Sequence, residues 1–138
     1  MSDKQITRVH DVMKTDFDLV DGRMTVMQAL NKMKHVETKS LIVDKRHVDD
    51  EYGMLLLSDV AKKVIGMDRS PERINVYEIM SKPVLAVDSC MDIRYCARYF
   101  ERFGLSRAPV IDNGKVVGIV SYTDMVLKGL VKFDDLED

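Results

Sequence analysis

The stretch GLSRAPVIDNGKVVGIVSYTDMV, residues 104–126, decides the fold of this chain. It contains two apolar, β-branched runs, APVID at 108–112 and KVVGIV at 115–120, separated by Asn113 and Gly114. An Asn-Gly pair accepts the positive φ angles that a tight hairpin turn requires. After the second run, Ser121 and Asp124 lie three positions apart and precede the apolar residues Met125 and Val126, a pattern typical of a helix start. The stretch therefore predicts a β-hairpin that leads directly into a helix.

The same pattern occurs earlier in the chain, which makes an internal repeat the main organising feature. Four pairs of identical residues are separated by 67 positions: Val9 and Val76, Met13 and Met80, Asp21 and Asp88, Met24 and Met91. After one gap Asp44 matches Asp112 at an offset of 68, and after another Gly53 matches Gly118 and Asp59 matches Asp124 at an offset of 65. The sequence therefore predicts two copies of one structural unit.

Each copy predicts the same order of elements: a short helical turn, a strand, an amphipathic helix, a two-stranded hairpin and a closing helix. In the first copy these are residues 9–13, 17–20, 27–36, 40–44 with 52–57, and about 59–66. In the second copy they are 76–80, 83–87, 93–103, 108–112 with 115–120, and about 124–131, with Gly104 at the expected C-cap of the amphipathic helix.

The predicted fold class is α/β (α+β), built from two β-α-β-β-α repeats. The first repeat with its N-terminal segment covers residues 1–66, a linker covers 67–75, the second repeat covers 76–131, and an acidic tail covers 132–138. A single unit of this kind leaves one apolar sheet face uncovered, so we expect the two repeats to pack through their sheets and share a core.

Composition and charge narrow the function classes. The 138 residues carry a net charge of −2, which argues against a nucleic-acid or anionic-membrane partner. No apolar run approaches the roughly 18 residues of a membrane span. The first residues lack the apolar core of a signal peptide, so the cytoplasm is the expected location.

Cysteine and histidine placement gives no support for metal or redox chemistry. Cys90 and Cys96 are six positions apart, which is neither a redox nor a zinc spacing, and Cys96 is expected to be a small buried apolar residue. The three histidines, His10, His35 and His47, show no ligand spacing. We expect no metal site, no catalytic residues and no enzymatic activity, since no nucleophile–base pair or phosphate-binding loop stands out.

The hairpin loop of the first copy, KRHVDDE at 45–51, is longer and more charged than its counterpart. The simpler interpretation is a solvated loop. Asp49, Asp50 and Glu51 could also attract a cation.

Taken together, VHDVM at 9–13, VYEIMSKPV at 76–84 and the stretch 104–126 resemble a tandem pair of cystathionine-beta-synthase (CBS) domains, often called a Bateman module. The resemblance covers about residues 6 to 131. It implies two repeats related by a pseudo-twofold axis, often dimerised into a flat disc, so a homodimer is expected. It also implies an adenosine-containing ligand between the repeats and an effector protein that is regulated in trans.

The resemblance assigns a main nucleotide site to the second copy. Asp124 would accept the ribose hydroxyls, Ser121 and Thr123 would lie near sugar and phosphate, and Arg107 would meet phosphate. The adenine would be flanked, chiefly by backbone, by two residues of the other repeat, Phe17 and Asp18. From the residues alone, Ser121-x-x-Asp124 fits a helix capping box better than a ligand site, and Arg107 fits a solvated surface arginine as well as a phosphate contact.

A weaker second site is expected in the first copy, where GMLLLSD at 53–59 aligns with GIVSYTD. Asp59 and Ser58 are retained there and Lys39 could serve near phosphate, but Leu56 replaces the serine and can neither donate nor accept a hydrogen bond. One nucleotide per chain is therefore expected rather than two.

The sequence thus predicts a regulatory or sensory module that requires no cofactor and binds an adenine nucleotide or a related ligand: AMP, ADP, ATP, NAD or S-adenosylmethionine. The alternative is a ligand-free dimeric scaffold in which Ser121 and Asp124 form only a cap. The third hypothesis is a small nucleotide-handling enzyme.

Overall fold

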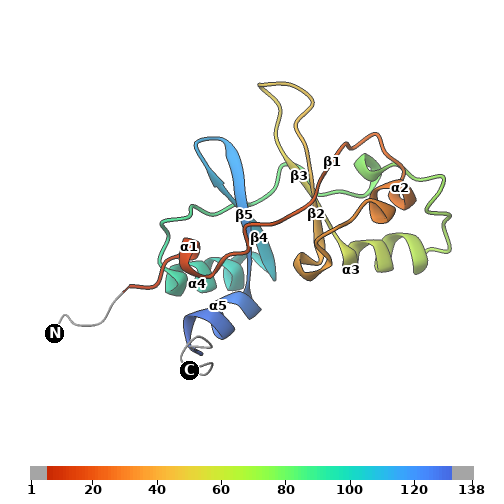
Figure 1. Ribbon diagram of the computed structural model, residues 1–138. Coiled ribbons are helices and arrows are strands. Elements are labelled where there is room, and N and C mark those ends of the chain that lie inside the picture. The colour runs from red at the N-terminus through yellow and green to blue at the C-terminus, as the bar shows by residue number, and fades with distance from the viewer. Residues whose placement is uncertain (1–5, 132–138) are drawn as a thin grey trace. The chain divides into compact units, whose positions relative to one another are not determined.

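Residues 6–131 are described by a computed structural model of this chain, in which short strands alternate with helices (Figure 1). The acidic tail predicted at 132–138 lies outside the described residues. The elements are, in order, α1 Val9–Val12, β1 Leu19–Val20, α2 Val26–Asn31, η1 Val36–Thr38, β2 Ser40–Val43, β3 Gly53–Leu56, α3 Leu57–Val60, η2 Ala61–Ile65, η3 Val76–Glu78, α4 Ile93–Phe103, β4 Arg107–Asp112, β5 Lys115–Ser121 and α5 Tyr122–Gly129.

The strands form two small sheets, which confirms the α+β class. In the first, the order is β1-β2-β3, with β1 parallel to β2 and β2 antiparallel to β3. In the second, β4 and β5 form the antiparallel hairpin, and Val87 pairs in parallel with Val110 of β4. Both predicted hairpins are therefore present, and in each copy the segment before the amphipathic helix pairs in parallel with the hairpin's first strand.

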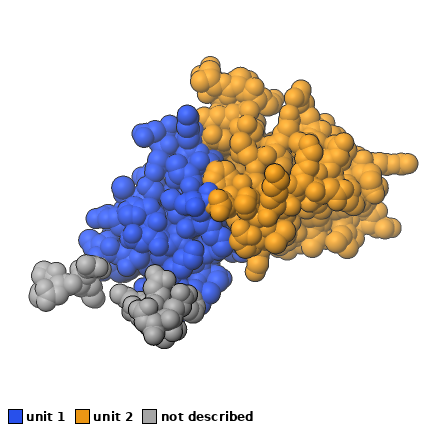
Figure 2. All heavy atoms as spheres, viewed as in Figure 1, with its two compact units in different colours: residues 1–15, 85–138 blue, residues 16–84 orange. Residues whose placement is uncertain are grey.

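The chain divides into two compact units whose boundaries differ from those of the sequence repeats (Figure 2). Unit 1 contains residues 1–15 and 85–138, and unit 2 contains residues 16–84. Consequently α1, which opens the first repeat, belongs to unit 1 with the strands of the second repeat. In the same way η3, which opens the second repeat, belongs to unit 2.

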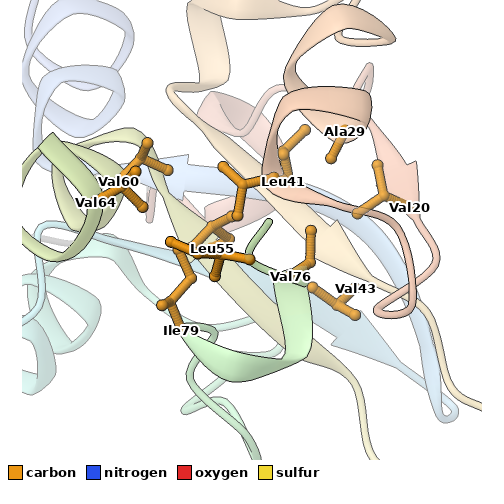
Figure 3. Packing of buried hydrophobic residues seen from close by; sticks show 11 residues of the cluster. Val20, Ala29, Leu41, Val43, Leu55, Val60, Val64, Val76 and Ile79 are labelled. Carbon is orange, nitrogen blue, oxygen red and sulfur yellow. The ribbon is translucent and has the colours of Figure 1, made fainter. Parts of the chain in front are cut away.

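Each unit has its own apolar core, and each core includes a segment contributed by the other repeat. In unit 2, Val76 and Ile79 of the 74–81 segment pack with the strand residues Leu41 and Leu55 (Figure 3). In unit 1, buried residues of α1 pack with those of α4, β4 and β5; the cluster includes Val9, Val12, Cys96, Phe100, Ala108, Val110 and Val120. The predicted burial of Cys96 is confirmed.

The backbone hydrogen bonds repeat at the sequence offset of 67. Val9 N–H donates to the Met91 carbonyl over 2.8 Å, and Val76 N–H donates to the Met24 carbonyl over the same distance. The internal repeat is thus present in the hydrogen bonding as well as in the sequence.

The expected match of Asp44 with Asp112 is wrong by one residue. The Asp44 N–H donates to the Val20 carbonyl (2.8 Å), and the equivalent bond in unit 1 runs from the Ile111 N–H to the Val87 carbonyl (3.0 Å). The offset therefore remains 67 along this strand. Asp112 therefore lies one residue beyond the position equivalent to Asp44. The pairing of β4 with β5 also shifts between Val110 and Ile111, a β-bulge whose extra residue, Val117, lies on β5.

The predicted strand at 83–87 is wrong in length, because only Val87 makes a β-bridge. Its N–H donates to the Pro109 carbonyl, and its own carbonyl accepts from Ile111. Pro83 lacks the N–H that would extend such a ladder. The predicted strand at 17–20 is likewise shorter, since β1 is Leu19–Val20.

The helix predicted at 27–36 ends early, at Asn31, although its Thr25–Gln28 capping box is present. The carboxylate of Asp18 accepts hydrogen bonds from the backbone N–H groups of Lys34 (2.9 Å) and His35 (2.8 Å). These bonds hold the chain in a turn that leads into η1 instead of another helical turn.

The hairpin turn and the helix C-cap predicted in the second copy are confirmed. Asn113 has φ 52° and Gly114 φ 79°, as the tight hairpin turn requires. Gly104 ends α4 with φ 66°, and its N–H donates to the Phe100 carbonyl. The closing helices α3 and α5 begin at Leu57 and Tyr122, two residues earlier than predicted, and η2 continues α3 as a π-helical turn.

The long hairpin loop of the first copy is not simply solvated. The Asp50 side chain is 7% exposed and accepts from Arg46 (2.9 Å) and Lys82 (2.8 Å). These two hydrogen-bonding cations hold the pKa of the Asp50 carboxyl well below its usual range. Asp50 is therefore neutralised by basic side chains of its own unit.

Candidate functional site

Ser121 and Asp124 form a reciprocal capping box at the N-terminus of α5. The backbone N–H of Asp124 donates to Ser121 Oγ over 3.2 Å, and the backbone N–H of Ser121 donates to Asp124 Oδ2 over 3.0 Å. Ser121 has the extended backbone of an N-cap residue. The capping interpretation of this motif is confirmed.

Asp124 does more than cap α5. The residue is buried, with an exposed fraction of 3%, and its carboxylate also accepts from two further donors. Oδ2 also accepts from the Ser121 hydroxyl over 3.0 Å. Oδ1 forms an ion pair with Nζ of Lys14, whose side chain is 25% exposed. A buried carboxylate, a hydroxyl and an ammonium group therefore meet at the start of α5.

Lys14 was not among the sequence-predicted site residues. It follows α1 and is fixed against β5 by two backbone hydrogen bonds, from its N–H to the Ile119 carbonyl (2.8 Å) and from the Ile119 N–H back to its carbonyl (2.9 Å). Gly118 permits this approach, since a Cβ at that position would lie 2.6 Å from the Lys14 carbonyl oxygen. The glycine in GIVSYTD therefore helps to place a lysine 110 positions from its carboxylate partner.

Arg107 is the second cation of the site. It lies at the start of β4, directly opposite Ser121 in the β4–β5 pairing, and is partly buried. Burial lowers the pKa of the guanidinium, while the nearby Asp124 carboxylate opposes this shift. Arg107 is thus not the fully solvated surface arginine of the alternative interpretation. Thr123 lies in the first turn of α5 and is exposed.

Phe17 and Asp18 belong to unit 2, and their role toward an adenine ring stays a prediction. Asp18 is buried, with an exposed fraction of 8%, and its carboxylate accepts hydrogen bonds from the backbone N–H groups of Lys34 and His35. Its backbone carbonyl accepts from Ile42 over 2.9 Å. These contacts give Asp18 a structural purpose in its own unit.

The counterpart of this site in unit 2 has different chemistry. Leu56 occupies the N-cap of α3 and makes no side-chain cap hydrogen bond, while Asp59 is in the first turn and Ser58 is exposed. Lys39 is exposed, with a left-handed φ of 57°.

The strand pairing also shows which residues of unit 2 correspond to the two cations. Ser40 pairs with Leu56 as Arg107 pairs with Ser121, so Ser40 and not Lys39 is the counterpart of Arg107. Ser81 pairs with Met54 as Lys14 pairs with Ile119. The unit 2 counterpart thus has serines where unit 1 has an arginine and a lysine.

Unit 2 has two hollows at the carboxyl ends of β1 and β2, which share Asp21, Arg23 and Arg46 in their linings; the second also contains Tyr77 and Lys82. Several of the lining charges pair within the unit: Arg23 with Asp21 over 2.8 Å, and Arg46 and Lys82 with Asp50. None of the sequence-predicted site residues lines either hollow.

Within residues 6–131, no group of three or more His, Cys, Asp or Glu side chains is arranged to hold a metal ion. In the same part of the chain, no helix has the length and apolar character needed to cross a membrane.

Comparison with known proteins identifies the family. The CBS domain family matches residues 76–130. The structure resembles a hexameric CBS-CP12 protein from bloom-forming cyanobacteria with a TM-score of 0.86 and 33% identity, covering 91% of this chain and 69% of that one. The chain belongs to the CBS-domain proteins, and its fold is that of a CBS pair.

Two more distant relatives extend the comparison. An uncharacterized protein of Methanopyrus kandleri, MK0525, is 26% identical over 119 residues, which is 86% of this chain; this chain spans 60% of that protein. The CBS domain pair of protein MJ0100, solved with 5′-methylthioadenosine and S-adenosyl-L-methionine, has a TM-score of 0.73 at 20% identity and covers 97% of this chain and 100% of that one. At that identity the likeness concerns the fold alone.

Proposed function

We propose that this chain is a regulatory module that binds an adenosine-containing ligand at the Asp124 site and transmits its occupancy to a partner protein. The observation that carries the proposal is the composition of the site in unit 1. A buried carboxylate lies at the N-terminus of an eight-residue helix, with Lys14 paired to it and Arg107 across from Ser121. The capping box alone requires neither cation.

These groups suit the parts of a nucleotide. A carboxylate can accept hydrogen bonds from both hydroxyls of a ribose, as in dinucleotide-binding folds. A helix N-terminus favours phosphate through its N–H groups and dipole, and an arginine fork binds phosphate oxygens in pairs. The adenosyl ligands of the MJ0100 CBS pair support this choice of ligand class.

The candidate ligands are AMP, ADP, ATP, NAD and S-adenosylmethionine, bound as regulatory ligands and not as cofactors. One site per chain is proposed, because Leu56, Ser40 and Ser81 replace the polar and cationic groups in unit 2. The output would be a changed arrangement of repeats or of a homodimer. Its size is limited by the difference in the ligand's affinity for the two arrangements.

A thermal-shift panel of the five ligands tests the proposal. A ligand at 100 times its dissociation constant adds roughly 2.7 kcal/mol to the free energy of unfolding, a shift of several degrees for a chain of this size. We expect at least one ligand to raise the melting temperature of the wild-type chain. Asp124→Ala and the more conservative Asp124→Asn should abolish this shift, while Asp59→Ala, the matched change in unit 2, should retain it.

The ligand-free dimeric scaffold is the second candidate, and the closed capping box favours it, because Ser121 and Asp124 already satisfy each other. No shift with any of the five ligands at millimolar concentration, from a folded wild-type chain, would favour the scaffold. A shift that survives in folded Asp124→Asn would place the ligand elsewhere.

A further inference from the structure

Lys14 carries an inference about which adenosine ligands the site accepts, and this inference rests on the proposed function. We propose that Lys14 is a specificity-determining residue, which selects ligands bearing phosphate over neutral nucleosides and over the sulfonium of S-adenosylmethionine. Lys14 lies outside the CBS-type motif of residues 104–126. It reaches the site from the segment after α1.

The Asp124 carboxylate has a limited hydrogen-bonding capacity. Two carboxylate oxygens offer about four acceptor positions. Three donors are already present: the Ser121 N–H, the Ser121 hydroxyl and the Lys14 ammonium. A ribose that donates both of its hydroxyls to Asp124 therefore has to replace at least one of these donors.

The donor that leaves is the Lys14 ammonium. Both Ser121 donors are part of the cap three residues away, and losing the backbone bond would open the first turn of α5. Lys14 reaches Asp124 through a flexible four-carbon stem, so its ammonium can move without any change in the backbone.

The displaced ammonium remains beside the site. The Lys14 backbone is fixed to Ile119 by two hydrogen bonds, and its side chain is only 25% exposed. A partly buried cation that loses its partner is unfavourable, since neither water nor a counter-charge fully replaces the lost pair. A ligand phosphate supplies a new partner, whereas a neutral nucleoside leaves the ammonium unpaired.

Arg107 acts in the same direction. Arg107 lies opposite Ser121 in the β4–β5 pairing and near enough to Asp124 for that carboxylate to influence its pKa, so the site contains two cations, Lys14 and Arg107. A sulfonium brings a further positive charge into this group, and like charges in a partly desolvated site repel. The unit 2 counterparts, Ser81 and Ser40, offer no such charge, so the selectivity belongs to the Asp124 site.

Isothermal titration calorimetry on the full chain with AMP, adenosine and S-adenosylmethionine tests the proposal. We expect the wild-type chain to bind AMP about tenfold or more tightly than the other two ligands, because charge-assisted bonds to phosphate are strong. Lys14→Met, which keeps the stem and removes the charge, should lower this preference by about tenfold and leave adenosine binding equal or tighter. Lys14→Arg should retain the preference, and Lys115→Met, an exposed control on β5, should match the wild type.

The outcomes separate this inference from the proposed function. If Lys14→Met weakens AMP and adenosine by the same factor, Lys14 only supports the fold, and the inference fails while the function stands. Equal wild-type affinity for AMP and S-adenosylmethionine also overturns it. If no adenosine ligand binds the wild type, both fail. If Lys14→Met does not fold, the wild-type preference and its retention in Lys14→Arg decide.

Discussion

At the residue scale, the two carboxylate oxygens of Asp124 have different kinds of partner. Oδ2 is committed to the Ser121 cap, whereas Oδ1 is held by the Lys14 ammonium at the end of a flexible four-carbon stem. Oδ1 is therefore the oxygen that the proposed ligand would take over. The first repeat begins its closing helix with Leu56 and no side-chain cap. A closing helix can therefore begin without a side-chain cap at the equivalent position of the first repeat.

The two cysteines give a prediction at the same scale. Cys96 is fully buried in unit 1, and burial raises its pKa to about 11, whereas Cys90 is exposed. Because thiolate is the reactive form, we expect Ellman's reagent at pH 8 to modify one thiol per native chain rapidly and the second only in denaturant. Cys90→Ser should remove the fast phase. A native Cys90→Ser chain that reacts at the denatured rate would contradict the burial of Cys96.

The same shift has a consequence for stability at alkaline pH. Folding raises the pKa of Cys96 from its ordinary value of 9.0 to about 11. Below pH 9 the thiol is protonated in both the folded and the unfolded chain, so it does not change the free energy of unfolding. Between pH 9 and about 11 the thiol ionises in the unfolded chain but not in the folded one, which favours unfolding. Stability should therefore fall across this window, and Cys96→Ala should lessen the fall.

At the scale of single elements, turns and caps could be predicted from sequence, because their signals are local. The Asn113-Gly114 turn, the Gly104 cap and the α5 start all depend on residues within a few positions. The length of the 83–87 strand and the match of Asp44 could not, since both depend on which residues pair between separate strands. The pairing of Lys14 with Asp124 crosses 110 positions, so no local pattern reveals it.

Gly118 gives the prediction at this scale. A Cβ there would lie 2.6 Å from the Lys14 carbonyl oxygen, which is fixed backbone, so Gly118→Ala must displace the segment that carries Lys14. We expect a loss of about 1–3 kcal/mol in the free energy of unfolding, the usual cost of overpacking. Urea titrations followed by circular dichroism measure it.

Gly53→Ala is the matched control in unit 2. Its new Cβ would meet the Met80 sulfur at 2.8 Å and the Ser81 carbonyl at 3.2 Å, and a flexible thioether can move aside. Gly53→Ala should therefore cost less than Gly118→Ala. Equal costs would show that the Lys14 backbone is not the limiting contact.

At the scale of the whole molecule, the compact units exchange their first segments relative to the sequence repeats. Local patterning could not reveal this, because VHDVM and VYEIM have the same apolar spacing and either could join either core. The exchange bears on the proposed function, since the segment that leaves α1 brings Lys14 to the closing helix of the other repeat. If a ligand binds at Asp124 as proposed, the first segment to change its contacts would be the one after α1.

Because the first segments are exchanged, a destabilising substitution in each of them should weaken a different compact unit. Val9 and Val76 are equivalent in sequence and both fully buried, Val9 in the core of unit 1 and Val76 in that of unit 2. Truncation of either to alanine should cost about 2 kcal/mol through lost burial and the remaining cavity. In hydrogen exchange followed by mass spectrometry, Val9→Ala should lower protection mainly in α4, β4 and β5, and Val76→Ala mainly in β1–β3. The reverse assignment, with Val9→Ala exposing β1–β3, would mean that each first segment packs within its own repeat.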